Sequence, residues 1–154
     1  PRVAILGRHP DGSLRDAKVH NLPASDMVTA VRFDGSLYFA NVAYFEDAIL
    51  EAVASNPKAK YLLVVGNGIN ELDASGEEVM HHLVERLNAA GVTVVFSGLK
   101  KQVLDVMRAT GLFGLITQAN IHATADHALA YIYEQSGDQH GSDAMRPLAT
   151  LPTT

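Results

Sequence analysis

The chain has 154 residues, 47% of them hydrophobic, which predicts one domain with a sizeable apolar core. Its formal net charge of −5, with no basic tract longer than Lys100-Lys101, argues against nucleic acid or an anionic membrane surface as the main partner. The absence of cysteine excludes disulfides and thiolate metal sites, and no segment approaches the ~18 apolar residues of a membrane span or resembles a signal peptide.

The N-terminal part predicts strands ahead of the first helix. Residues 3–6 form a short apolar strand, and residues 7–26 are polar and rich in turn residues, which predicts a long surface connection. Residues 27–33 are rich in β-branched side chains, and the Asp34-Gly35 pair after them predicts a two-residue hairpin turn. Residues 37–39 would then form the returning strand.

The middle of the chain predicts helices that alternate with buried strands. Asn41 is placed to cap a helix that runs to about Ala54, along which apolar residues recur at three- and four-residue spacing. Residues 61–65 are continuously apolar, as expected of a strand covered on both faces. An amphipathic helix over residues 76–90 and a second buried strand over residues 92–96 follow.

The C-terminal part predicts two more helices and a tail. Residues 100–109 form an amphipathic pattern that Gly111 would end in the left-handed conformation, and residues 112–116 include a short apolar strand. Thr124 is placed to cap a last helix. From residue 136 the chain is polar, contains proline and lacks periodicity, so we expect residues 136–154 to be disordered.

Together these elements predict one α/β domain over residues 1–135. Strands that alternate with helices of about 10–15 residues imply right-handed crossovers between parallel strands. The expected fold is a mixed, mostly parallel sheet flanked by helices, with an N-terminal β-hairpin that adds an antiparallel edge.

The segment between the strand at 61–65 and the next helix has the most specific local pattern. Ser75 is followed three residues later by Glu78, which is the spacing of a capping box and predicts Ser75 as the helix N-cap. A phosphate on Ser75 would be attracted by the helix dipole and repelled by the nearby acids Asp73, Glu77 and Glu78. Ser75 is therefore also a candidate regulatory phosphoacceptor.

Catalytic and metal-binding functions find little support in the sequence. Ser75 lacks the Gly-x-Ser-x-Gly turn of a serine hydrolase. The adjacent His81 and His82 cannot share one helix face as a His-x-x-x-His metal pair does. The turn at residues 66–68 is rich in glycine but lacks the P-loop lysine and the dinucleotide pattern, so nucleotide binding stays an open alternative. We expect no catalytic residue, no cofactor and no metal.

Residues 69–76, Ile-Asn-Glu-Leu-Asp-Ala-Ser-Gly, resemble the signature loop of STAS domains, in the version found at the cytoplasmic C-terminus of SulP-type anion transporters. Anti-sigma factor antagonists share the core Asp-x-Ser-Gly and are phosphorylated on the serine before the glycine, which is Ser75 here. Residues 32–41 and 96–103 are similar to the family's hairpin and to its later strand and helix. The resemblance extends in order over about residues 1–134.

The sequence departs from the family pattern at two positions. Family members often carry an acid at the end of the strand where this chain has Val65, and a second hydroxyl residue where it has Ala74. A site that needs a carboxylate at that strand end is therefore not expected here.

The resemblance also implies which residues contact partners. The regulatory loop around Ser75 would consist of Asn70, Asp73, Gly76 and Glu78. Phe39 and Asn41 are candidate contacts for a partner or an anion, although Tyr38 and Phe39 also fit the core or an edge strand.

Two functions are consistent with these observations. The first is a non-enzymatic regulatory and interaction domain of a SulP-type secondary anion transporter for sulfate, bicarbonate or dicarboxylate, on the cytoplasmic side of the inner membrane. Its partners would be its own transmembrane domain, cytosolic proteins such as acyl carrier protein or a kinase, and a second copy in a homodimer. The second is a free-standing phospho-switch protein that acts through Ser75. Residues 6–8 resemble the segment that follows the last membrane span in SulP proteins. Together with the long loop over residues 7–26 and the trailing tail, they favour the first function, and the start at Pro1 suggests a soluble fragment of a membrane protein.

Overall fold

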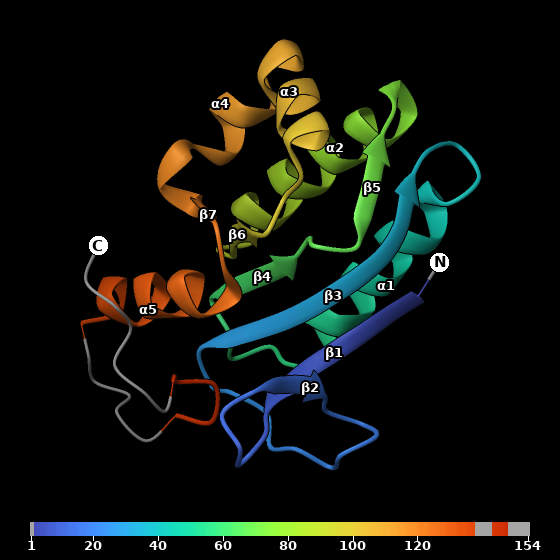
Figure 1. The fold of residues 1–154 in the computed structure, drawn as a ribbon. Helices are drawn as coiled ribbons and strands as arrows, with labels where there is room; N and C mark the ends of the chain where they lie inside the picture. The colour runs from blue at the N-terminus through green and yellow to red at the C-terminus, as the bar shows by residue number, and fades with distance from the viewer. Residues whose placement is uncertain (1, 138–142, 148–154) are drawn as a thin grey trace.

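The structure, a computed structural model, describes residues 2–137 and 143–147. The described residues form a seven-stranded sheet with the order β2-β1-β3-β4-β6-β7, and β5 pairs with β3 off this path (Figure 1). The strands are β1 (Arg2–Arg8), β2 (Leu14–Asp16), β3 (Val28–Leu37), β4 (Tyr61–Val65), β5 (Ile69–Leu72), β6 (Thr93–Ser97) and β7 (Ile121–His122). The helices are α1 (Val42–Ala54), α2 (Ala74–Ala89), α3 (Lys101–Thr110), α4 (Leu112–Ile116), the 3-10 helix η1 (Gln118–Asn120) and α5 (Ala125–Gln135).

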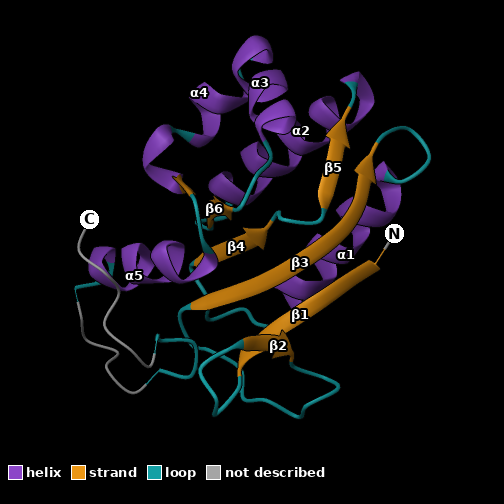
Figure 2. Cartoon of the chain, viewed as in Figure 1, coloured by secondary structure: helices purple, strands orange, loops and turns teal. Residues whose placement is uncertain are grey.

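Helices cover both faces of the sheet (Figure 2). β4 shows this arrangement most clearly, because its successive side chains point to opposite faces. Leu62 and Val64 belong to a larger core that the sheet forms with α1, α2, α3 and α4, whereas Leu63 and Val65 belong to a smaller core with α5. Both faces are therefore buried, which explains why β4 is continuously apolar rather than alternating.

The directions of the strands confirm the predicted fold class. β3, β4, β6 and β7 run parallel to their neighbours along the sheet, and β1 is antiparallel to both β2 and β3. β1 and β2 form the N-terminal hairpin, in which Leu6 pairs with Asp16 and Arg8 with Leu14. The surface connection predicted over residues 7–26 is wrong in part, because a three-residue strand such as β2 is too short to give a periodic signal.

The hairpin turn predicted at Asp34-Gly35 is wrong. β3 continues through this pair to Leu37, and Gly35 has a φ of 146° that accommodates a shift in pairing register. The second half of β3 pairs in parallel with β5, and the amide of Gly35 donates to the carbonyl of Gly68 at 2.8 Å. Residues that suit a hairpin turn thus serve here as an irregularity in a continuous strand.

Two further strand predictions are wrong. Tyr38 and Phe39 lie in the turn after β3 and are 43% and 81% exposed, so they belong neither to the core nor to an edge strand. Residues 112–116 form helix α4, because a short apolar run suits a buried helical turn as well as it suits a strand. The predicted ends of two helices are confirmed. Gly111, after α3, has a left-handed φ of 83°, and the side chain of Thr124 caps α5.

Part of the predicted disordered tail has a defined place in the structure. Residues 136–137 follow directly on α5, and residues 143–147 pack against the domain. Met145 is only 1% exposed in the core beneath α5, so the prediction of disorder is wrong for this segment. Residues 138–142 and 148–154 lie outside the described residues.

Candidate functional site

The segment expected to be a regulatory loop begins as a strand at the carboxyl end of β3. In β5, Ile69 and Leu72 are buried, whereas the residues between them are exposed. Leu72 pairs with Leu37 of β3, and the carbonyl of Leu37 then accepts a hydrogen bond from the amide of Asp73 at 3.1 Å. The start of α2 is therefore attached directly to the end of β3.

Asp73, and not Ser75, is the N-cap of α2. Its backbone is extended, with φ −93° and ψ −177°, and its Oδ1 accepts a hydrogen bond from the amide of Gly76 at 2.8 Å. The prediction of a capping box from Ser75 to Glu78 is wrong, because β5 ends at Leu72 and Asp73 is the first residue able to take the cap position. Aspartate caps a helix as well as serine does. Ser75 lies in the first helical turn and is partly exposed, and Glu78 is exposed one turn further along.

Gly76 is required by the close contact between α2 and β3. A Cβ atom on Gly76 would lie 2.1 Å from the carbonyl oxygen of Leu37 and 2.9 Å from Cδ1 of Leu72. No Cβ atom fits at such a distance from backbone, so the glycine in the Asp-x-Ser-Gly pattern lets the helix begin directly on the strand.

Asn70 links this segment to the start of α3. Its Oδ1 accepts a hydrogen bond from Nζ of Lys100 at 2.6 Å, and its carbonyl accepts one from Nε2 of Gln102 at 3.2 Å. The residue expected as part of a regulatory loop thus also ties β5 to a neighbouring helix.

The glycine-rich turn at residues 66–68 is filled by neighbouring side chains. A Cβ on Gly68 would lie 1.7 Å from Oδ1 of Asp34, and one on Gly66 would lie 2.5 Å from Cδ2 of Leu99. The amide of Gly66 already donates to the carbonyl of Ser97 at 2.8 Å. These glycines allow close packing between turns, so their presence needs no bound nucleotide to explain it.

Phe39 and Asn41 have different surroundings in the turn between β3 and α1. Asn41 occupies the predicted N-cap position, but its backbone is helical and its side chain caps no amide. Its Nδ2 instead donates to the carbonyl of Ser36 at 2.8 Å, which braces the turn. Phe39 is 81% exposed. Because this turn follows Leu37, it lies at the same end of the molecule as the start of α2 (Figure 1).

Sequence reasoning missed a polar cluster at the other end of β3. Oδ1 of Asp143 accepts a hydrogen bond from Oγ of Ser25 at 2.6 Å and another from the hydroxyl of Tyr133, and Oδ2 accepts from the amide of Asp26 at 3.0 Å. Burial alone would raise the pKa of Asp143, but these hydrogen bonds and one from the amide of Met145 hold it below its ordinary value. Burial, together with the bond to Asp143, raises the pKa of Tyr133.

Arg8 also contacts this C-terminal segment. It is only 6% exposed, and its guanidinium donates to the carbonyls of Met145 at 3.0 Å and Gly12 at 2.9 Å. It also forms an ion pair with Asp126 at 2.8 Å. Arg8 and Met145 are 137 residues apart in sequence, and Ser25 and Asp143 are 118 apart, so no local motif could have indicated this cluster.

The described residues offer no cluster of three or more His, Cys, Asp or Glu side chains that could hold a metal ion. His81 lies between the carboxylates of Glu77 and Glu85, at 3.7 and 3.6 Å, on the surface of α2. None of the described helices is both long and apolar enough to cross a membrane. The first turn of α2 carries the partly exposed hydroxyl of Ser75 with the acids Asp73 and Glu77 close to it in sequence, and the exposed ring of Phe39 lies on the separate turn after β3.

Residues 20–128 match the STAS domain family, and the chain belongs to that family. The resemblance seen in residues 69–76 is thereby confirmed. High affinity sulfate transporter 2 of Stylosanthes hamata is 24% identical over 142 residues, which covers 84% of this chain and 21% of the transporter. The chain therefore spans about one fifth of the length of this relative.

Solved structures share the fold at low sequence identity. The murine Solute Carrier 26 family member A9 anion transporter, in its inward-facing state, is 18% identical with a TM-score of 0.76, covering 86% of this chain and 22% of that one. The STAS domain of a SulP transporter from Vibrio cholerae is 19% identical with a TM-score of 0.61, covering 77% and 88%. The anti-sigma factor antagonist SpoIIAA in its unphosphorylated form is 17% identical with a TM-score of 0.57, covering 75% and 93%.

Proposed function

We propose that this chain is the cytoplasmic regulatory and interaction domain of a SulP-type secondary anion transporter and that it catalyses no reaction. The relationship to a sulfate transporter over 84% of the chain supports this, and so does the chain's span of only one fifth of that relative. Sulfate is the transported anion that this relationship favours. The domain would comprise residues 1–135, since β1 and β2 belong to the sheet but precede the family match, and residues 143–147 would be an added segment that packs against it.

The observation that carries the proposal is the exposed surface at the carboxyl end of β3. Phe39 is 81% exposed on a turn that Asn41 braces, and this turn follows Leu37, whose carbonyl accepts a hydrogen bond from the amide of Asp73 at the start of α2. Aromatic residues are among those that most often anchor protein interfaces. The surface formed by Phe39, Tyr38 and the first turn of α2 would dock to the transmembrane domain or to a cytosolic protein.

Ser75 is the proposed switch on this surface. Its side chain is not the helix cap, and it lies in the first turn of α2 close to Asp73, whose carboxylate holds the amide of Gly76. A phosphate there would compete with Asp73 for the helix amides and repel the carboxylates of Asp73 and Glu77. Phosphorylation would thus alter the docking surface while leaving the two cores intact.

Sulfate uptake by cells that produce the full-length protein tests the proposal. Phe39→Ser should lower uptake at least about fivefold, because it removes the interface anchor without touching the core. Val19→Ser is the matched control, since Val19 is 74% exposed in the segment that follows β2 and lies outside the proposed surface. Equal uptake by the parent and the Phe39→Ser variant would contradict the docking role.

A second candidate function is that of a free-standing phospho-switch protein. The specific observation in its favour is that the similarity to SpoIIAA covers 93% of that protein, whose structure is described in an unphosphorylated form. The complete reading frame separates the two proposals. Apolar spans encoded before this domain support the transporter, and a reading frame that encodes this domain alone contradicts it and leaves the second function.

A further inference from the structure

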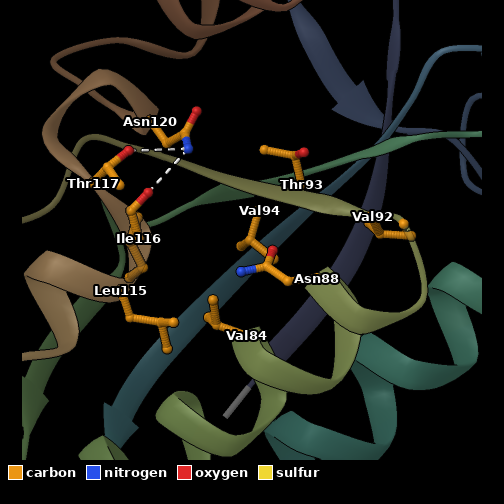
Figure 3. A pocket seen from close by; sticks show the side chains of 10 residues that line it. Val84, Asn88, Val92, Thr93, Val94, Leu115, Ile116, Thr117 and Asn120 are labelled. Carbon is orange, nitrogen blue, oxygen red and sulfur yellow. Dashed lines mark hydrogen bonds between the residues drawn. The ribbon is translucent and has the colours of Figure 1, made fainter.

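A cavity of about 380 Å³ lies between the last turns of α2, the start of β6 and the segment that joins α4 to η1 (Figure 3). This volume falls in the range of small-molecule sites. The cavity is lined by Val84 and Asn88 toward the C-terminal end of α2, whereas Ser75 lies at the N-terminal end of the same helix, about 14 to 20 Å away along its axis. It is therefore separate from the proposed docking surface.

The lining combines an apolar floor with an uncharged polar rim. Val84, Val94 and Leu115 form the floor, and the polar side chains come from opposite sides of the cavity in Figure 3. The polar residues of the rim are Asn88, Thr93, Thr117 and Asn120. None of the ten lining residues carries a charge, and the nearby C-terminal end of α2 has a partial negative charge. This environment disfavours an anion and favours a molecule that donates hydrogen bonds.

The rim contains a strained residue that its neighbours hold in place. Thr117 has φ 75° and ψ 148°, a backbone conformation that is found almost only for glycine. Its amide donates to the carbonyl of Phe113 at 2.8 Å, and its carbonyl accepts from the amide of Asn120 at 3.1 Å. Strained residues of this kind concentrate where proteins clamp ligands.

The side chain of Asn120 leaves one hydrogen bond unmade. Its Nδ2 donates to the carbonyl of Ile116 at 2.9 Å and contacts Oγ1 of Thr117 at 3.4 Å, as Figure 3 shows. Its Oδ1 is buried and has no hydrogen-bond partner among the described residues. A buried acceptor without a partner is unfavourable, so this corner of the cavity combines a strained backbone at Thr117 with an incompletely satisfied side chain at Asn120.

We propose that this cavity binds a small uncharged molecule with a flat apolar part and a hydrogen-bond donor, of the aromatic carboxamide class. The apolar part would lie on the floor formed by Val84, Val94 and Leu115, and the donor would face the polar rim. The site goes beyond the proposed regulatory function, because its ligand is neither the transported anion nor a protein partner.

Amide chemical-shift mapping of the 15N-labelled chain with benzamide tests this site. Saturable shifts should centre on the amides of Thr93, Thr117 and Asn120, with a dissociation constant on the order of millimolar for a probe of about nine non-hydrogen atoms. Benzoate has the same shape but is an anion that lacks the donor, and it should bind at least about tenfold more weakly.

Two tryptophan variants on the exposed side of α2 locate the binding. Asn88→Trp should fill the mouth of the cavity and weaken benzamide at least about tenfold, whereas Ala89→Trp, exposed but outside the lining, should leave its affinity unchanged. Three results would each overturn the proposal: no saturable shifts with benzamide, equal affinity for benzoate, or equal loss of binding in both tryptophan variants.

Discussion

The two ends of β3 carry polar residues in opposite surroundings. At the carboxyl end, Asp73 and Ser75 lie at the surface and the neighbouring Phe39 is 81% exposed. At the amino end, Ser25 is 3% exposed and its hydroxyl donates to Asp143, which Tyr133 also contacts. β3 has ten residues, so the two ends lie about 33 Å apart.

The surface at the carboxyl end of β3 can accept a substitution or a new charge, whereas the buried cluster at the amino end cannot lose a member without loss of stability. At the Asp143 end, buried groups satisfy one another, so the loss of one leaves the others unpaired. At the Ser75 end, water can replace most of what a substitution removes, and the domain can accept a new charge without unfolding. A regulatory modification is therefore expected at the carboxyl end of β3, and a structural role is expected for the cluster at its amino end.

The largest loss of stability is expected at Gly76, where α2 and β3 are in close contact. Gly76→Ala places a Cβ 2.1 Å from the backbone carbonyl of Leu37, so α2 must move away from β3. We expect a loss of about 3 kcal/mol in the free energy of unfolding, measured by urea denaturation. Gly114→Ala in α4 is the control, because nothing lies within 4 Å of its Cβ position, and it should be neutral or slightly stabilising. Similar results for the two variants would show that α2 is free to shift on β3.

The next largest effect is expected at Asp143. Asp143→Asn keeps the shape of the side chain but replaces one acceptor with a donor, which cannot serve the amide of Asp26. The variant should lose about 2 kcal/mol at pH 7, whereas Asp47→Asn on the exposed side of α1 should change stability by less than about 0.5 kcal/mol. Equal stability of parent and Asp143→Asn would show that the cluster is not the structural anchor proposed.

Lowering the pH should remove the extra stability that the parent has over the Asp143→Asn variant. Burial opposes ionisation, but the hydrogen bonds from Ser25, Tyr133 and two backbone amides lower the pKa of Asp143 in the folded state below its unfolded value of about 3.9. The stabilisation is therefore fully present above pH 4 and is lost as the pH falls through the lower folded pKa. The stability difference between parent and Asp143→Asn should shrink below about pH 4, and a constant difference down to pH 2 would contradict this origin.

Smaller effects should identify the cap of α2. Asp73→Ala removes the acceptor for the amide of Gly76 and should lower the free energy of unfolding by about 1 kcal/mol. Ser75→Ala removes a hydroxyl that is not the cap and should change it by less than about 0.5 kcal/mol. Urea denaturation of both variants measures the difference, and the reverse order would restore Ser75 as the cap.

Sequence reasoning predicted well those elements whose cause is local. The continuous apolar run of β4 follows from burial on both faces, and Gly111 and Thr124 mark helix ends through their own conformations and side chains. The error at Ser75 shows the limit of such signals, because Asp73 and Ser75 both suit an N-cap. The choice depended on where β5 ends, and β5 exists only because the end of β3 is available for pairing.

Features that depend on distant residues could not be predicted from the sequence. The continuation of β3 beyond Gly35 depends on pairing with Ile69. The Asp143 cluster joins Ser25 to a residue 118 positions away, in a segment whose composition indicates disorder. The strained backbone of Thr117 lies where α4 ends and η1 begins, and no pattern in the residues around it indicates that conformation.

Ser75→Asp should have the smallest effect on stability and still change function. Its charge gains from the helix dipole at the start of α2 and loses a similar amount to repulsion from Asp73 and Glu77, so the free energy of unfolding should change by less than about 0.5 kcal/mol. Sulfate uptake by the full-length protein should fall, because the added charge alters the surface beside Phe39. Ala74→Asp adds the same charge one residue earlier and should leave uptake within about twofold of the parent. If Ser75→Asp supports parental uptake, Ser75 is not the switch; if both aspartate variants lower uptake equally, the response is to charge at this helix end rather than to Ser75 itself.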